Sequence, residues 1–152
     1  MIASAQTLRL LKLIEPFRER TTFFGLTFGL SPAGYDVRLD SSADAPDSCW
    51  IHPGQFMLGS TIERFTMPDN LLGIVHDKST WARRGLCVQN TVIEPGWRGY
   101  LTLELTNHGG ERLHLCRGMP IAQIVFHFLD KATEVPYAGK YQDQERGPQE
   151  AR

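Results

Sequence analysis

The sequence predicts one all-β domain, a jelly roll or β-barrel, with one or two short helices. After Phe17, short apolar runs alternate with Gly, Pro, Asp and Asn, which is typical of folds with many short antiparallel strands. Few segments have a helical pattern, and this favours a jelly roll or barrel over a mixed fold. The length of 152 residues and the hydrophobic share of 41% suit one core.

The N-terminal segment is predicted to be a short helix. Ser4 is a candidate N-cap, and Leu8 and Leu11 belong to an apolar stripe on one helical face. Pro16 has no backbone N–H to donate, so the helix should end before it.

Strands are predicted wherever a short apolar run lies between turn-forming residues. These runs cover residues 35–39, 55–60, 71–76, 86–89, 100–106, 113–116 and 121–129. Residues 40–48 are predicted to form a polar loop, and the Asn-His-Gly-Gly sequence of residues 107–110 a hairpin turn.

The last part of the chain differs in composition from the rest. From Lys131 the sequence becomes polar, which divides the chain into a β domain over residues 1–130 and a flexible lid or tail over residues 131–152. Composition alone favours a frayed tail. Tyr137, Lys140 and Gln144 are residue types that grip nucleotides, so a lid that closes over a bound triphosphate is the other prediction.

Composition also argues against several classes of protein. The net charge of −1 disfavours a broad nucleic-acid-binding face. No apolar run reaches the length of a membrane span, and the first residues lack the pattern of a signal peptide, so a cytoplasmic protein without a membrane segment is expected. Cys49, Cys87 and Cys116 are widely spaced and lack the zinc-deaminase signature, so reduced thiols and no zinc site are expected.

The segment over residues 77–85 is the first candidate for chemistry. It is predicted to be a short helix closed by Gly85, with Ser79 as N-cap and Arg83 on the same helical face. Free N–H groups at a helix start, beside Lys78, suit a phosphate chain. A solvated basic turn is the alternative.

The predicted strand over residues 100–106 is the second candidate. Side chains alternate along a strand, so its leucines face one way while Thr102 and Glu104 share the opposite face. A solvent-facing glutamate would be the simplest interpretation. Trp97 and Tyr100 flank this face, which favours a pocket instead.

Several motifs in order resemble those of the dCTP deaminases, in the trimeric dUTPase-like superfamily. The resemblance covers nearly the whole chain. The first motif, over residues 78–83, reads Lys-Ser-Thr-Trp-Ala-Arg, and the second comprises Ile-Glu-Pro-Gly-Trp at residues 93–97 and Leu-Thr-Leu-Glu at residues 101–104. Further matching segments are residues 14–17, 31–38, 118–123 and 139–142.

The resemblance implies a distorted jelly roll that forms a homotrimer with active sites between subunits. Glu104 would be the proton shuttle, while Ser79 and Arg83 would position the attacking water and the cytosine. Mg²⁺ would bridge the triphosphate, and no protein metal ligands are implied. The substrate-binding residues would be Lys78, Thr80, Trp81, Ala82, Glu94, Thr102, Leu103, Gln123, Tyr137, Lys140 and Gln144.

The implied reaction, conversion of dCTP to dUTP and ammonia, agrees with these residue types. One carboxylate in a dry pocket can activate water for attack at C4, protonate the ring nitrogen and protonate the departing ammonia. Glu94 and Trp97 occupy places where trimeric dUTPases carry Asp and Tyr, so a dUTPase or a bifunctional enzyme that forms dUMP stays open. A non-enzymatic nucleotide-binding trimer, a C5-modified dCTP substrate and dTTP as inhibitor are further possibilities.

Overall fold

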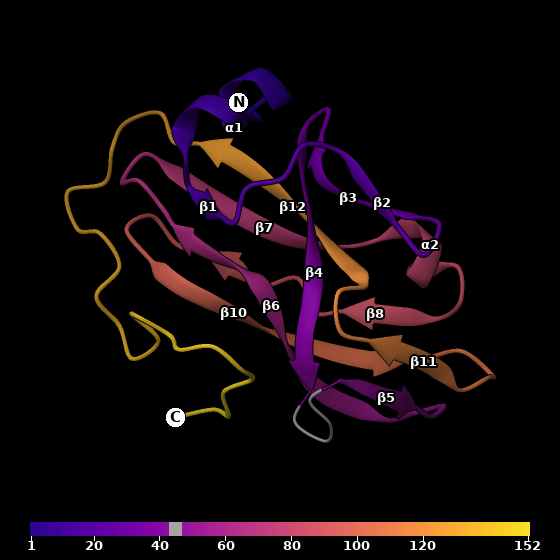
Figure 1. The fold of residues 1–152 in the computed structure, drawn as a ribbon. Coiled ribbons are helices and arrows are strands. Elements are labelled where there is room, and N and C mark those ends of the chain that lie inside the picture. Colours follow the sequence, from indigo (N-terminus) through magenta and orange to yellow (C-terminus); the bar gives the residue numbers. More distant parts are fainter. Residues whose placement is uncertain (43–46) are drawn as a thin grey trace.

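The computed structural model describes residues 1–42 and 47–152 and consists mostly of β-strands (Figure 1). In chain order the elements are α1 (Ala5–Leu11), β1 (Ile14–Glu15), β2 (Thr21–Phe23), β3 (Leu26–Ser31), β4 (Gly34–Ser42), β5 (Ser48–Ile51), β6 (Phe56–Thr66), β7 (Leu71–Asp77), α2 (Ser79–Ala82), β8 (Leu86–Val88), β9 (Val92–Ile93), β10 (Arg98–Asn107), β11 (Leu113–Cys116) and β12 (Pro120–Phe128). Neither described helix is long and apolar enough to cross a membrane.

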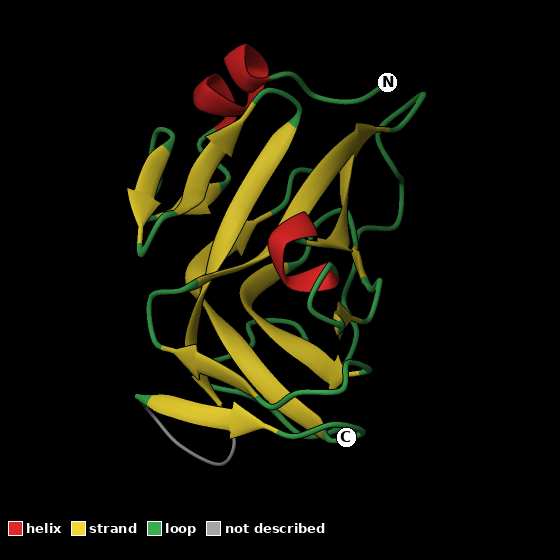
Figure 2. Ribbon diagram, turned by 90° about the vertical axis from the view of Figure 1, so that its right-hand side faces the viewer, coloured by secondary structure: helices red, strands yellow, loops and turns green. Residues whose placement is uncertain are grey.

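One large antiparallel sheet dominates the fold and curls into a half-barrel (Figures 1 and 2). Its strand order is β8-β10-β6-β4-β12-β7-β9, with β1 paired to β6, β3 to β4 and β2 to β3. Strands β5 and β11 form a separate pair at the end of the curled sheet opposite α1 (Figures 1 and 2). The all-β, dUTPase-like class predicted from the sequence is confirmed.

The core lies inside the curl and follows the alternation of the strands. In β10, Leu101, Leu103 and Leu105 are buried, whereas Thr102 and Glu104 are half-buried on the outer face. Burial of each leucine contributes about 1.5–3 kcal/mol. The inward leucines therefore fix which way the polar side chains of β10 point.

The N-terminal helix begins and ends as its sequence predicts. The Ser4 hydroxyl accepts a hydrogen bond from the Thr7 backbone N–H at 3.4 Å, which confirms the N-cap. Lys12 follows the helix in a left-handed conformation, φ +51°. Leu8 is buried but Leu11 is 37% exposed, so the predicted apolar stripe contacts the core through only part of its length.

Each predicted strand is present, with changed ends. Strand β6 continues to Thr66, six residues past its predicted end at residue 60, and β4 continues to Ser42, into the predicted polar loop. Residues 43–46 of that loop lie outside the described residues, and β5 begins at Ser48. Strands β1, β2, β3, β5 and β9 were not predicted. All three residues of β2 are exposed, so it carries no alternating pattern.

The predicted hairpin at residues 107–110 is wrong, because β11 pairs with β5 and not with β10. Asn107 turns the chain from one sheet to the other. Its side-chain Nδ2 donates to the carbonyls of Ile51 at 3.0 Å and Glu111 at 2.8 Å, and its Oδ1 accepts from the Gly109 N–H at 2.9 Å. The buried amide thus takes the place of hairpin pairing.

Candidate active site

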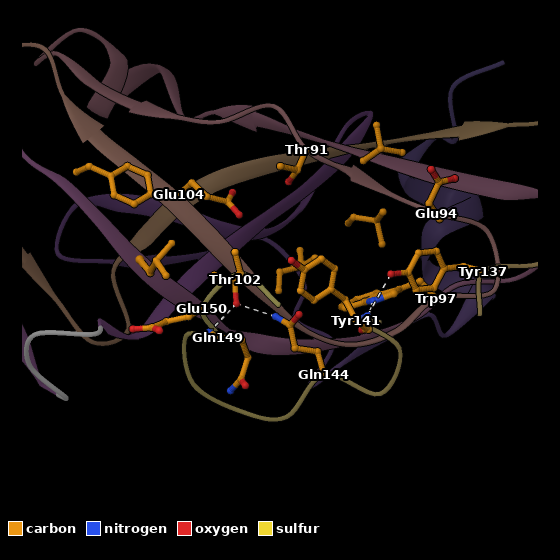
Figure 3. Close-up of a pocket in the computed structure, with 16 residues that line it drawn as sticks. Thr91, Glu94, Trp97, Thr102, Glu104, Tyr137, Tyr141, Gln144, Gln149 and Glu150 are labelled. Atoms are coloured by element: carbon orange, nitrogen blue, oxygen red, sulfur yellow. Dashed lines mark hydrogen bonds between the residues drawn. The ribbon is translucent and has the colours of Figure 1, made fainter. Parts of the chain in front are cut away.

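A cavity of about 730 Å³ lies beside the outer face of β10 (Figure 3). Strands β6 and β10 form one wall, residues 91–97 form a second, and the C-terminal segment forms a third. Its lining residues are Phe56, Leu58, Thr91, Val92, Ile93, Glu94, Trp97, Leu101, Thr102, Glu104, Tyr137, Tyr141, Gln144, Gln149, Glu150 and Ala151.

Glu104 is the half-buried carboxylate of the β10 wall. It lies opposite Leu58 of β6, so one neighbour in the sheet is apolar. Its Oε2 atom is buried, and none of the described residues hydrogen-bonds it. Burial raises the pKa of Glu104 above the ordinary value of a glutamate. A carboxyl group tuned towards neutrality, with one oxygen free of partners, can both accept and donate a proton.

Thr102 shares the face of β10 with Glu104 and lies two residues before it. Its Oγ1 accepts hydrogen bonds from the Gln144 side-chain Nε2 at 2.7 Å and from the Gln149 backbone N–H at 3.0 Å (Figure 3). Gln144 Nε2 also donates to the Tyr100 carbonyl at 2.9 Å. The C-terminal segment is therefore fastened directly to the strand that carries Glu104.

The turn before β10 provides the second anchor for the C-terminal segment. The Trp97 indole N–H donates to the Tyr141 carbonyl at 2.7 Å, and the Tyr137 N–H donates to the Pro95 carbonyl at 2.8 Å. Gly96 has φ +81°, and a Cβ there would lie 2.5 Å from Pro136. Only glycine allows this close approach of the two segments.

Residues 137–149 thus pack along the β domain in this structure. Gly99 and Gln144 form a parallel β-bridge, and Arg98 Nη2 contacts Asp143 Oδ2 at 3.0 Å. The frayed-tail alternative has no support in these contacts. That the segment acts as a lid over substrate stays a prediction.

The predicted helix over residues 77–85 is α2, a helix of four residues. Its N-cap is Lys78, and Ser79 is the first helical residue, so the predicted Ser79 cap is wrong by one position. Trp81 is buried and its indole N–H donates to the Pro120 carbonyl at 2.7 Å. The Trp81 and Ala82 backbone N–H groups donate to the Lys78 carbonyl, which leaves the N–H groups of Ser79 and Thr80 outside the helical bonds.

The side chains around α2 divide into exposed and buried ones. Ser79, Thr80 and Arg83 are exposed. Lys78 is buried, and its Nζ donates to Asp36 Oδ2 at 2.7 Å. Its charge is thus already balanced inside the chain. Asp36 belongs to a matched segment, but the sequence gave no sign of this partnership.

The structure divides the predicted site residues into two groups. Glu94, Thr102, Glu104, Tyr137 and Gln144 line the cavity. The α2 residues and Gln123, whose Nε2 donates to Ser31 Oγ at 3.2 Å, lie elsewhere and do not line it. The Leu103 side chain is buried in the core, which leaves only its backbone for a ligand, and Lys140 Nζ lies 5.0 Å over the Tyr141 ring.

The cavity lining is acidic and apolar. Three carboxylate residues line it, Glu94, Glu104 and Glu150, and no described lining residue is Lys or Arg. Within the described part of the chain, no group of three His, Cys, Asp or Glu residues could hold a metal ion. The sequence did not single out Phe56 or Leu58, although their alternation in β6 opposite Thr106 and Glu104 places them on this wall.

Comparisons with known proteins agree with this architecture. A family model described as dCTP deaminase-like matches residues 41–129. A Campylobacter concisus protein named dCTP deaminase is 35% identical over 161 aligned residues, which cover 88% of this chain and 87% of that protein. The chain belongs to the dCTP deaminase family. A Mycobacterium tuberculosis relative named dCTP deaminase, dUMP-forming, is 44% identical over 67% of this chain and 57% of its own length.

Solved structures of this deaminase family and of dUTPases share the fold. The Agrobacterium tumefaciens 2′-deoxycytidine 5′-triphosphate deaminase matches with a TM-score of 0.66 and 17% identity, over 84% of this chain and 47% of that one. The native EIAV dUTPase matches with a TM-score of 0.56 and 23% identity, over 70% and 84%. A phage phi11 dUTPase described as coordinating a structural Mg(II) ion matches at 0.57 and 14%, over 82% and 92%.

Proposed function

We propose that this chain deaminates dCTP to dUTP and ammonia, with Glu104 as the catalytic acid and base. The observation that carries the proposal is the half-buried Glu104 carboxyl group, which has a raised pKa and a buried oxygen without a hydrogen-bond partner, in the cavity of a dCTP deaminase family member. Such a group has capacity left for a proton in transit.

In the proposed reaction, Glu104 takes a proton from water as the water attacks C4 of cytosine. The proton passes to the ring nitrogen N3, and a second transfer protonates the amino group as the C4–N bond breaks. The apolar neighbours Phe56, Leu58 and Leu101 keep bulk water from the carboxyl group. Thr102 is placed on the same strand face to hydrogen-bond the edge of the base.

We further propose that the complete site forms between copies of the chain in a homotrimer. A triphosphate needs cations, yet no described residue of the cavity lining is basic. Ser79 and Arg83, the predicted water- and base-positioning residues, are exposed outside the cavity. Docking α2 of one copy onto the Glu104 cavity of another would supply what each lacks.

Mg²⁺ fits this proposal as a companion of the substrate. The described residues offer no three-ligand protein site, so the triphosphate oxygens would be its main ligands. When bound there, Mg²⁺ supplies positive charge that offsets the phosphates. Lys140, close to the cavity residue Tyr141, and the free Ser79 and Thr80 N–H groups would contact the same phosphates.

Product analysis with dCTP and, separately, dUTP tests the proposed function. Chromatography should show dUTP and ammonia from dCTP and no change in dUTP. A second candidate, the bifunctional enzyme that forms dUMP and pyrophosphate, is favoured by the mycobacterial relative named dUMP-forming. Glu94 argues against it, because its side chain is one methylene longer than an Asp, and misplacing a reacting group by about 1 Å can cost about 10²-fold in rate.

Two finer properties can be measured in the same assay. A C5-modified dCTP that is turned over faster than dCTP would identify a modified nucleotide as the substrate. Added dTTP should lower the rate if it competes for the Glu104 cavity. Glu94 and Thr91 line the cavity wall on which such selectivity would depend.

A further inference from the structure

The last residues of the chain lie in the cavity that the proposed function assigns to the nucleotide. Gln149, Glu150 and Ala151 line it together with Thr102 and Glu104 (Figure 3). They come from beyond the segment that resembles the family's C-terminal motif, which ends at Gln142.

This terminal segment, residues 147–152, also satisfies groups that are proposed to hold substrate. The Gln149 backbone N–H donates to Thr102 Oγ1 at 3.0 Å, which occupies the hydroxyl next to Glu104 on the strand face. Lys140 Nζ donates to the Arg152 carbonyl oxygen, so the candidate phosphate-binding cation is engaged as well. One short segment therefore occupies both a proposed base contact and a proposed phosphate contact.

Charge separates the terminal segment from a bound triphosphate. Glu150 adds a carboxylate to a lining that already holds Glu94 and Glu104, and none of the described lining residues is basic. Negative phosphates are disfavoured beside this carboxylate. The nucleotide and the terminal segment should therefore not fill the cavity together.

The chain has an anchor just before this segment. Arg146 makes two contacts with the Asp40 carboxylate, at 2.7 and 2.9 Å, and Asp40, only 6% exposed at its side chain, also pairs with Arg117 at 2.9 Å. Gly147 follows with φ +98° and open space around it. Residues 148–152 can therefore swing about Gly147 while Arg146 stays in place.

We propose that residues 147–152 are an internal ligand of the Glu104 cavity that competes with the nucleotide. The identity of the competitor rests on the proposed function. The C-terminal region then has two opposed parts: residues 137–146 support substrate binding, and residues 147–152 oppose it until the nucleotide displaces them.

Binding measurements on a chain that ends at Gly147 test the proposal. In a Glu104→Gln background, which stops turnover, the shortened chain should bind dCTP about tenfold tighter than the full chain, because dCTP no longer displaces hydrogen bonds of the segment. The full-length Gln149→Pro variant, which lacks the N–H that Thr102 accepts, should also bind dCTP more tightly. Equal dCTP affinity in all three chains would overturn the proposal.

A labelled peptide of residues 145–152 separates this proposal from the proposed function. The peptide should bind the shortened chain, dCTP should displace it, and a control peptide with Gln149→Pro should bind more weakly. Failure of the peptide to bind would also overturn the proposal. If the peptide binds but dCTP neither displaces it nor is deaminated, the segment is a ligand of the cavity and dCTP is the wrong competitor.

Discussion

Lys78 Nζ lies 2.7 Å from Asp36 Oδ2, and each side chain is only 10% exposed. The pair joins β4 to the N-cap of α2, a helix too short to be stable by itself. Together with the Trp81–Pro120 hydrogen bond, it fixes the helix that presents Ser79 and Arg83. A buried pair of this kind holds position more than it adds stability.

Asp36→Asn should lower the free energy of unfolding by about 3–5 kcal/mol, because it leaves the Lys78 ammonium buried without its counter-charge. Adding Lys78→Met should recover much of this loss, and urea unfolding of the two single variants and the double variant measures the coupling. Glu19→Gln, which breaks the exposed Arg9–Glu19 pair, is the matched control and should barely change the unfolding midpoint. Additive losses at Asp36 and Lys78 would contradict the pairing.

Glu104→Gln should reduce turnover of dCTP by about 10²–10⁴-fold while nucleotide binding survives, because the amide keeps the size of the carboxyl group but cannot shuttle protons. Steady-state kinetics and equilibrium binding of dCTP measure the two effects. Glu145→Gln, an exposed change outside the cavity, is the control and should have normal turnover. Near-normal turnover by Glu104→Gln would remove this residue from the mechanism.

The raised pKa of Glu104 also predicts how stability depends on pH. The folded chain holds the proton of this group more tightly than the unfolded chain, so ionisation of Glu104 destabilises the fold as pH rises from the ordinary glutamate pKa through the raised one. Glu104→Gln should therefore melt higher than the unmodified chain at neutral pH, and this difference should vanish below the ordinary pKa. A constant difference at every pH would contradict burial as the cause.

Mixing two inactive variants tests the shared site. In randomly mixed trimers of Arg83→Ala and Glu104→Gln chains, about one quarter of the sites should combine an intact Arg83 with an intact Glu104 of a neighbour and regain activity. Light scattering on the unmixed chain should give the mass of three copies. A fully active monomer, or mixed trimers without activity, would end the shared-site proposal.

The sequence predicted most where residues near each other in the chain determine the outcome. The alternation of leucines in β10 places Thr102 and Glu104 on one face, and the structure has them there. The Ser79 cap was wrong because Lys78, which pairs with Asp36, has the extended backbone of the N-cap, φ −83° and ψ 123°. That partner lies 42 residues away, and no local pattern contains it.

Long-range pairing also explains what the sequence missed around the cavity. The Asn-His-Gly-Gly segment has the composition of a hairpin, but the partner of β11 is β5, more than sixty residues earlier. The C-terminal segment has the composition of a frayed tail, and its order depends on contacts with Trp97, Gly99 and Thr102. Composition describes what a segment contains but not the surface it meets.

The ratio of ammonia to dUTP formed from dCTP and Mg²⁺ tests the central claim most directly, measured on the same samples for the unmodified chain and for Glu104→Gln. The account predicts one ammonia for each dUTP from the unmodified chain, with little dUMP or pyrophosphate, and almost no product from the variant. Pyrophosphate and dUMP in place of dUTP, or ammonia released equally by both chains, would contradict it.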